Sequence, residues 1–227
     1  IARRLAAYDP GNQFAVNYMW GTTGLGYNVR KVREVLGADG RIDSWDTFFK
    51  PEMLAKFKDC GVHVLDSSDD VMPNALNYLG LNPNSKEQAD LEKAADLLMT
   101  VRPFIRKFHS SEYLNALASG EICLVLGWSG DINQLNLQNQ NKFGFGLPES
   151  GGTFSSDNML IPVTSPNKAG AEAVMNYYYD PVVAARVANY INYVCPVNGA
   201  QDAMAKVNPN NVKNPLIFPD QKMWSNL

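Results

Sequence analysis

The sequence predicts an α/β protein in which strands and helices alternate along the chain. Short apolar runs that contain β-branched residues and end at glycine, such as residues 122–126, have the length and composition of buried strands. Between such runs, apolar residues recur at the spacing of amphipathic helices, most clearly over residues 91–99. This alternation favours a mostly parallel sheet whose strands are joined by right-handed crossovers. The 227 residues suffice for one large or two smaller domains with buried cores.

The first 135 residues carry the clearest succession of elements. Residues 14–28 predict two short strands joined or interrupted by the motif GTTG, because glycine weakens a continuous strand. Helices are expected over residues 31–36, 44–49, 51–60, 69–79, 84–102 and 110–118. Strands are expected over residues 62–65, 104–108 and 122–126. Pro51 suits the first position of its helix, and Ser85 with Gln88 forms a capping-box pattern.

After residue 135 the sequence becomes rich in amides and its pattern is less regular. A strand and turn are expected over residues 143–152, and a further strand over residues 158–163. Two helices, over residues 169–179 and 181–192, are separated by the pair Asp180–Pro181. From Asn208 onward asparagine and proline are frequent, which indicates mostly loop.

The composition is that of an ordinary globular protein and excludes several classes. The formal net charge is −3, with 45% hydrophobic and 19% charged residues. Lysine and arginine form no run or stripe, so nucleic acid is not an expected partner. No apolar stretch approaches the length of a membrane span.

Sequence motifs give no support to an enzyme, a metal site or a cofactor. The three cysteines and two histidines lack the spacing of metal ligands. The glycine-rich motif GTTGLG has the order GxxGxG, which differs from the dinucleotide-binding order GxGxxG. The sequence also shows no serine–histidine–aspartate set and no phosphate-binding loop. The motifs therefore give no basis for assigning an enzymatic activity.

The segment EICLVLGWSGD places Trp128 and Asp131 just beyond the carboxyl end of the predicted strand over residues 122–126. In open α/β sheets, ligands bind at this edge of the sheet. The alternative is that Trp128 belongs to the core and that Asp131 caps the following helix. The spacing of the two residues does not distinguish these interpretations.

Several long motifs follow one another in the order YMWGTTGLGYN, DSWD, LNYLG, RPFIRKFHSSEYLNALASGEIC, GWSGD, SSDNMLIP and VCPVNGA. With these motifs the chain resembles the periplasmic polyamine-binding proteins, which are the solute receptors of spermidine/putrescine ABC importers. The resemblance implies a periplasmic-binding-protein-like fold of type II, with two lobes that close on a ligand in the cleft between them. It covers the middle and later parts of the family, so we expect the N-terminal part of one lobe to lie outside this sequence.

The same resemblance implies a domain organisation and a cellular setting. Residues 1–19 would end a first-lobe segment and include a hinge strand, residues 20–135 would form the second lobe, and residues 136–227 would return to the first lobe. The implied location is the periplasm, or an extracytoplasmic face with a membrane anchor, and the implied protein partner is an ABC permease. We expect a monomer. The alternatives are a receptor for another cationic or small polar solute and an enzyme on the same scaffold.

A polyamine needs carboxylates for its ammonium groups and flat apolar walls for its methylenes. An ammonium group that leaves water is stabilised by a well-placed anion, and an aromatic face adds about 0.5 to 2 kcal/mol of cation–π attraction. The positions that match the ligand-binding residues of the family are Trp128, Asp131, Asp157, Tyr193, Asp70, Ser110 and Ser155.

Each of these matches has a structural alternative. Asp157 also suits a turn before a strand, and Asp70 suits the first turn of a helix. Ser110 also suits a helix N-cap, and Tyr193 a packed aromatic position. At the position of Asp70 the family usually has glutamate, so the shorter acid would reach a ligand only through water.

Two further matches concern an aromatic wall and a disulfide. Where the family has an aromatic wall, this chain has Ser155 beside Phe154, so either one wall is missing or Phe154 turns in through a bulge. This leaves the choice between putrescine and spermidine open. Family members with cysteines at the positions of Cys60 and Cys123 pair them, which implies this disulfide and leaves Cys195 unpaired.

Overall fold

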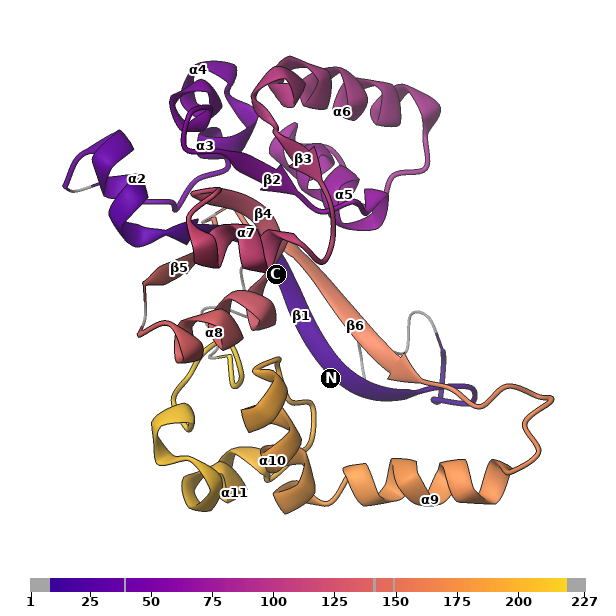
Figure 1. Cartoon of the computed structure of the whole chain (residues 1–227). Helices are drawn as coiled ribbons and strands as arrows, with labels where there is room; N and C mark the ends of the chain where they lie inside the picture. Colours follow the sequence, from indigo (N-terminus) through magenta and orange to yellow (C-terminus); the bar gives the residue numbers. More distant parts are fainter. Residues whose placement is uncertain (1–8, 39, 141, 149, 220–227) are drawn as a thin grey trace. The chain divides into compact units, whose positions relative to one another are not determined.

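The structure, a computed structural model, describes residues 9–38, 40–140, 142–148 and 150–219 (Figure 1). These residues form two compact units: a smaller unit of residues 9–21 and 155–219, and a larger unit of residues 22–154. The sequence places the end of the α/β lobe near residue 135, but the larger unit continues to residue 154. The reason is that residues 143–146 pair with its sheet, and that the indole of Trp45 donates to the carbonyl of Gly151 at 2.7 Å.

One mixed sheet forms the centre of the larger unit. Its strands lie in the order β3-β2-β4-β1-β5, and β6 also pairs with β1. The strands are β1 (Val16–Asn28), β2 (Val62–Val64), β3 (Lys107–Phe108), β4 (Leu124–Trp128), β5 (Phe143–Gly146) and β6 (Thr153–Met159). β2 is parallel to β3 and β4, whereas β1 is antiparallel to β4 and β5. The prediction of a mostly parallel sheet is therefore wrong. β1, which precedes the helical crossovers, lies between β4 and β5 and runs antiparallel to both.

β1 is one strand of 13 residues, so the predicted pair of short strands is wrong. Its last residues are hydrogen-bonded on both sides, to β4 and to β5, and this double ladder stabilises the strand despite its glycines. The glycines instead allow close packing. A Cβ atom on Gly26 would lie 2.6 Å from Cδ1 of Ile132, so a side chain there would force Ile132 to move.

Helices cover both faces of this sheet. They are α2 (Val29–Leu36), α3 (Asp46–Phe49), α4 (Pro51–Leu54), α5 (Ser68–Tyr78), α6 (Gln88–Val101), α7 (Tyr113–Ser119) and α8 (Ser129–Gln138), with 3-10 turns η1 (Ala55–Phe57) and η2 (Arg102–Phe104). α7 and α8 contact the sheet face that carries Gly127 and Gly26, and α5 contacts the opposite face, which carries Thr23. α6 packs against α5 (Figure 1).

The helix signals in the sequence had mixed outcomes. Pro51 occupies the first position of α4, as predicted. The capping box is wrong: α6 begins at Gln88 with Glu87 as its N-cap, and the Ser85 hydroxyl donates to Asp90 at 2.7 Å. The strand predicted over residues 104–108 shrinks to the two residues of β3, because the preceding residues form the 3-10 turn η2.

The smaller unit combines its part of β1 and β6 with three helices and the 3-10 turn η3 (Pro209–Asn211). The helices are α9 (Lys168–Tyr178), α10 (Pro181–Ile191) and α11 (Ala200–Val207). The predicted break between the first two is confirmed, since the Asp180 carboxylate accepts from the backbone of Val182 and Val183 at 2.9 and 3.1 Å. The strand predicted over residues 158–163 lies earlier, as β6, and ends before Pro162, which cannot donate to a ladder.

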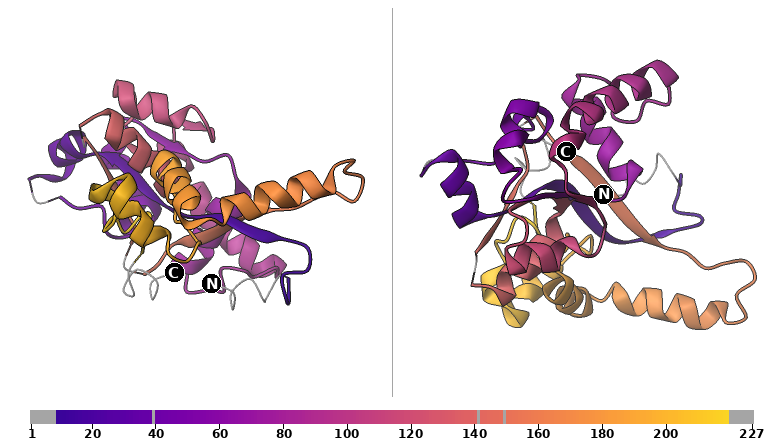
Figure 2. Two further views of the ribbon diagram at one scale, coloured as in Figure 1. Left: turned by 90° about the horizontal axis from the view of Figure 1, so that it is seen from below. Right: turned by 45° about the horizontal axis from the view of Figure 1, so that its top comes forward.

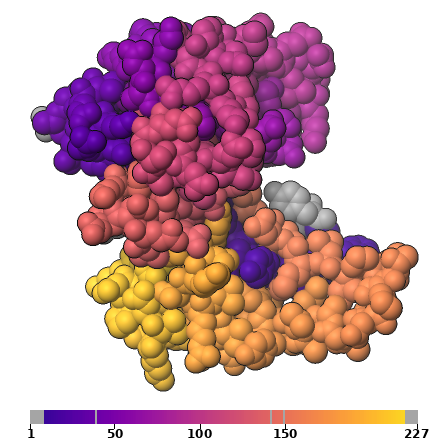
Figure 3. Space-filling view, in the orientation of Figure 1, coloured from indigo at the N-terminus to yellow at the C-terminus, as the bar shows by residue number. Residues whose placement is uncertain are grey.

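Small side chains hold the smaller unit's core together. Ala184, Ala185 and Ala188 of α10 are fully buried and let this helix pack closely on Met19 and Met204. α9 extends away from α10 and α11 in both views of Figure 2, and its residues lie at the surface in Figure 3. Throughout the described part of the chain, no helix combines the length and apolar character needed to cross a membrane.

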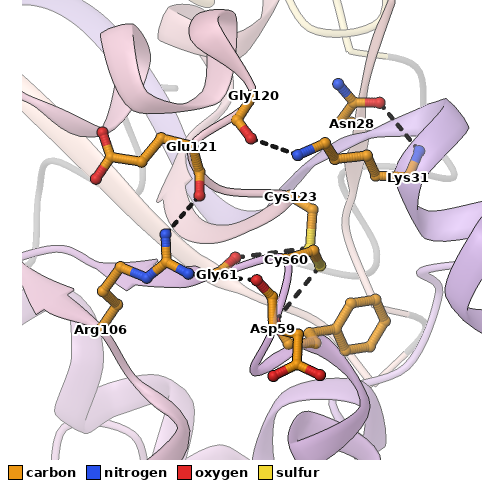
Figure 4. Close-up of a disulfide and its surroundings, with 10 residues drawn as sticks. Asn28, Lys31, Asp59, Cys60, Gly61, Arg106, Gly120, Glu121 and Cys123 are labelled. Carbon is orange, nitrogen blue, oxygen red and sulfur yellow. Dashed lines mark hydrogen bonds between the residues drawn. A yellow bond between two sulfur atoms is a disulfide. The ribbon is translucent and has the colours of Figure 1, made fainter.

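The disulfide implied by the family resemblance is confirmed. Cys60 and Cys123 are bonded, with their Cα atoms 5.5 Å apart, and Cys195 is a buried free thiol (Figure 4). The bond joins the turn before β2 to the residue before β4, two strands that pair in parallel. Nearby, the Arg106 guanidinium donates to the carbonyls of Glu121 at 2.6 Å and Asp59 at 3.4 Å. The backbone on either side of the disulfide is thereby fixed.

A buried histidine stands in the centre of β2. His63 is only 2% exposed, and neither of its ring nitrogens has a hydrogen-bond partner among the described residues. Burial lowers the pKa of His63, since the protonated ring loses hydration; Arg106 and Lys107 lower this pKa as well, while Glu121 and Glu112 raise it. The folded protein therefore holds this side chain in its neutral form.

We expect removal of the disulfide to destabilise the larger unit strongly. Cys60 and Cys123 are 63 residues apart in sequence, and a loop of this length gives a loss of about 2 to 4 kcal/mol in unfolding free energy for a Cys60→Ala/Cys123→Ala variant. Urea denaturation with and without a reducing agent measures this. The reductant should lower the stability of the wild type to that of the variant and leave the variant unchanged. Equal stability of the oxidised wild type and the variant would contradict the expectation.

The buried His63 predicts a loss of stability in mild acid. The unfolded chain takes up a proton near the ordinary histidine pKa of 6.5, whereas the folded chain does so only at lower pH. The stabilising effect is thus complete above about pH 6.5 and is lost as the pH falls below it. In chemical denaturation between pH 7.5 and pH 5, His63→Phe should lose less stability than the wild type. Parallel pH dependence of the two proteins would show that His63 does not contribute.

Candidate functional site

Polar and aromatic side chains meet where β4 ends, in the larger unit. Trp128 is the last residue of β4 and also the N-cap residue of α8. Its indole Nε1 donates to Oδ1 of Asp70 at 3.1 Å, and the Thr23 hydroxyl donates to the same oxygen at 2.6 Å. The register of the sheet explains this, since Thr23 lies directly opposite Trp128 in the β1–β4 pair. Asp70 reaches them from α5, which follows β2, the parallel neighbour of β4.

The carboxylate of Asp70 is stabilised in a site that is only 9% exposed. A buried charge requires hydrogen-bond donors, and Asp70 receives two at a single oxygen. Asp70 is also the third residue of α5, where the helix dipole favours a negative charge, so the predicted first-turn position is correct. The side chain of Asn74 donates to the Asp70 carbonyl at 2.7 Å and fixes the backbone.

Asp131 is held in a related way by a buried tyrosine. It is the third residue of α8, and its Oδ2 accepts from the Tyr113 hydroxyl at 2.6 Å. Tyr113 is the first residue of α7 and is fully buried. Its ring meets that of Trp128 edge to face, with centroids 6.5 Å apart. The N-cap interpretation of Asp131 is therefore wrong, because Trp128 occupies that position.

These contacts connect five side chains, which we call the tryptophan cluster: Thr23, Asp70, Trp128, Tyr113 and Asp131. In this sequence of contacts Trp128 stands between two carboxylates: it donates to Asp70 directly and is linked to Asp131 through Tyr113. Trp128 is half-buried and packs against the core, so part of its surface is accessible. Such a set offers an aromatic face together with negative charge, which suits an organic cation.

Ser110 lies in the loop after β3 and is half-buried. Its hydroxyl oxygen accepts from the backbone N–H of Asp66 at 3.0 Å, which joins the loops that follow two neighbouring parallel strands. The alternative of a helix N-cap is wrong, because α7 begins only at Tyr113 with Glu112 before it. The ring of His109 supplies the acceptor just before this helix, since its Nδ1 accepts from the backbone N–H groups of Ser111 and Glu112.

The other predicted residues lie in the smaller unit. Asp157 and Ser155 are two residues apart on β6 and share one face of that strand. The Tyr193 ring lies close to Gly21. A Cβ atom added to Gly21 would lie 3.0 Å from Cε1 of Tyr193 and 3.7 Å from the hydroxyl oxygen of Ser155. Ser155 and Tyr193 thus approach the same strand position, where a larger residue would require the Tyr193 ring to shift. Asp157 lies inside the strand, so the alternative of a turn is wrong.

Phe154 does not replace the aromatic wall that the family has at Ser155. β6 runs without interruption from Thr153 to Met159, and alternate residues of a strand face opposite sides. Phe154 therefore points to the side opposite Ser155 and Asp157. Of the two alternatives left by the sequence, strand geometry favours a missing wall over a bulge.

Two residues of the tryptophan cluster escape prediction from the sequence. Thr23 lies in the motif GTTGLG, whose glycine pattern does not mark the threonine as a site residue. Tyr113 resembles an ordinary helical core residue. Only the sheet register and the packing of α7 bring them to the two carboxylates. Among the described residues, no three histidine, cysteine, aspartate or glutamate side chains gather as a metal site would require.

Comparison of the sequence with known proteins finds relatives whose names describe solute-binding proteins. The family model for bacterial extracellular solute-binding proteins matches residues 4–218. A putrescine-binding periplasmic protein of Escherichia coli is 41% identical over 225 residues, which cover 96% of this chain and 60% of that protein. A putrescine/agmatine-binding protein of Pseudomonas aeruginosa is 39% identical over 232 residues, covering 100% and 62%. The chain thus spans about 60% of the length of these relatives.

Solved structures agree with these sequence matches. The substrate-binding protein of a spermidine/putrescine ABC transporter from Streptococcus pneumoniae superposes with a TM-score of 0.80 at 26% identity, covering 100% of this chain and 65% of that one. A lipoprotein of Treponema pallidum gives a TM-score of 0.74 at 25% identity, covering 89% and 60%. The two-lobed binding-protein fold expected from the family resemblance is therefore confirmed at the level of the fold.

The hydrogen bond between Tyr113 and Asp131 predicts a measurable effect on stability. Tyr113→Phe keeps the buried ring but removes the hydroxyl that donates at 2.6 Å to a charged acceptor. We expect a loss of about 1 to 3 kcal/mol in unfolding free energy, measured by urea denaturation. Tyr190→Phe is the control, because the Tyr190 side chain is 76% exposed and should tolerate the same change. Equal stability of both variants would argue against the contact.

Proposed function

This chain belongs to the family of bacterial extracellular solute-binding proteins, and we propose that it forms the ligand-binding part of a receptor that captures polyamines for an ABC importer. Putrescine or spermidine is the proposed ligand. Support comes from the names of relatives such as the putrescine-binding periplasmic protein of Escherichia coli, which is 41% identical. The observation that carries the proposal is the tryptophan cluster, in which an accessible indole is linked to two carboxylates.

The chemistry of the cluster suits an alkyl diamine. In this proposal Asp131 binds one ammonium group, while the face of Trp128 contacts the methylenes and attracts the cation. Asp70 belongs to the same site through its hydrogen bond to the indole. Ser110 adds a polar wall from the neighbouring loop. The proposed role is binding, and no catalytic step is assigned to any of these residues.

The smaller unit supplies the second anion in this proposal. Asp157 binds the other ammonium group, and Tyr193 and Ser155 line the ligand beside it. Their contacts over Gly21 and their shared face on β6 support this assignment. Because serine is small, the site lacks one aromatic wall at Ser155. The ligand is held between two lobes that close around it, as expected for a receptor of this family.

The cellular setting follows from the same relatives. We propose that the protein acts in the periplasm, or at an extracytoplasmic face, and delivers its ligand to the permease of an ABC importer. The names of the relatives from Escherichia coli and Salmonella typhimurium include the word periplasmic. The receptor is proposed to act as a monomer.

A ligand with two ammonium groups should bind much more tightly than one with a single group. A monoamine leaves one carboxylate desolvated and without its cation, which costs about 2 to 5 kcal/mol. We therefore expect putrescine to bind roughly 30-fold to several thousandfold more tightly than butylamine in calorimetry. Spermidine and agmatine complete the panel and define the preferred length. If butylamine binds as tightly as putrescine, the two-anion assignment fails.

Loss of the smaller unit's anion should weaken diamines selectively. Asp157→Asn keeps the shape of the side chain but removes its charge, so putrescine affinity should fall by about 30-fold or more while butylamine affinity changes less. Asp202→Asn makes the same chemical change at an exposed position of α11 and serves as the control. Unchanged putrescine affinity in Asp157→Asn would remove this residue from the site.

A further inference from the structure

We propose that Asp70 acts as a positioning residue: it fixes and polarises the indole of Trp128 and does not itself bind an ammonium group of the ligand. This inference rests on the proposed function, and it assigns to one carboxylate of the site a role different from that of the other two. The juxtaposition that carries it is a single oxygen, Oδ1 of Asp70, which accepts from both Trp128 and Thr23.

The geometry shows a carboxylate with one oxygen, Oδ1, engaged by two protein donors. Asp70 is 9% exposed, and its Oδ1 lies 2.6 Å from the Thr23 hydroxyl and 3.1 Å from the indole nitrogen. The three side chains come from α5, β1 and β4, so their meeting is fixed by the sheet and not by a mobile loop. A hydrogen bond to a charged acceptor is stronger than one between neutral groups. The contact therefore locks the rotation of the indole about its side-chain bonds.

The contact also changes the electronic character of the ring. A negative acceptor on the N–H group polarises the indole and increases the negative potential on its face. Cation–π attraction depends on that potential, so the carboxylate strengthens the interaction of the ring with an ammonium group without touching it. The charge of Asp70 thus acts on the ligand through Trp128, whereas Asp131 accepts from a tyrosine hydroxyl.

Substitutions at Asp70 separate positioning from direct binding. Asp70→Asn retains an oxygen that accepts from the indole and the hydroxyl, but it removes the charge. Asp70→Leu keeps the branched shape and the number of side-chain heavy atoms but removes the acceptor. For direct contact with an ammonium group, the first change alone should cost as much affinity as Asp131→Asn. For positioning, Asp70→Asn loses only the charge that polarises the ring, whereas Asp70→Leu also loses the acceptor that orients the indole. Asp70→Leu should therefore cost more affinity than Asp70→Asn.

The expected results are stated for putrescine in calorimetry. Asp131→Asn should lose about 30-fold or more in affinity. Asp70→Leu should lose about 5- to 30-fold, the range of one cation–π contact, and Asp70→Asn less than about 5-fold. Asp69→Asn, which removes an exposed carboxylate from the same helical turn, is the matched control for the charge and should be neutral. A loss in Asp70→Asn that equals that of Asp131→Asn would overturn the proposal.

A second measurement reports on the indole directly and does not need a ligand. The sequence contains four tryptophans, so an amide-type 15N–1H spectrum shows few indole signals, and Trp128→Phe identifies the relevant one. Asp70→Leu should shift that signal, whereas Asp70→Asn should retain most of its position. The indole signal of Trp45, which donates to the Gly151 carbonyl, should stay unchanged in both variants. A Trp128 signal that is insensitive to Asp70→Leu would overturn the proposal.

The two measurements distinguish failure of the proposed function from failure of the positioning role. If the wild type binds neither diamines nor other polyamines, the proposed function is wrong, while the indole spectrum still decides whether Asp70 holds Trp128. If the wild type binds putrescine and the spectrum does not respond to Asp70, only the positioning role is wrong. Thr23→Val provides a further check, because loss of its hydroxyl leaves the indole as the remaining donor to Oδ1 and should shift the Trp128 signal without abolishing binding.

Discussion

The structure depends on one strand, β1, that contributes backbone to both compact units. Its residues up to Gly21 belong to the smaller unit, and those from Thr22 onward belong to the larger one. In the larger unit the strand is hydrogen-bonded on both sides, to β4 and β5. In the smaller unit the backbone of Trp20 exchanges two hydrogen bonds with that of Val194, at 3.0 and 2.9 Å. This strand therefore sets the register of the candidate site residues in each unit.

The tryptophan cluster shows how a carboxylate site can be ordered before its ligand arrives. Asp70 and Asp131 each occupy the third position of a helix, and each accepts a hydrogen bond from a hydroxyl group of the protein. The helix dipole and these donors offset the cost of holding negative charge away from water. Because the side chains are already fixed, a ligand that binds them loses less conformational freedom from the protein side. Rigid support of this kind favours selectivity over adaptability.

Much of the fold follows from local signals. The apolar run over residues 122–126 predicted the central strand β4, and the pair Asp180–Pro181 predicted the break between α9 and α10. The prediction failed at β1, where local glycine content indicated two strands while pairing on both sides stabilised a single one. It failed again at Ser85, whose hydroxyl donates to Asp90 in place of the predicted capping box. In each failure a tertiary or medium-range partner outweighed the local preference.

The sequence alone determined the α/β class, the placement of Trp128 near the carboxyl end of the strand β4 and, through the family resemblance, the disulfide between Cys60 and Cys123. These features depend on local pattern or on motifs that persist across a family. Tertiary structure decided that Thr23 and Tyr113 hold the two carboxylates, because their partners are far away in sequence and meet them only through the register of β1 and the packing of α7. No periodicity encodes such contacts, since a hydrogen bond between distant residues depends on where the backbone places both groups.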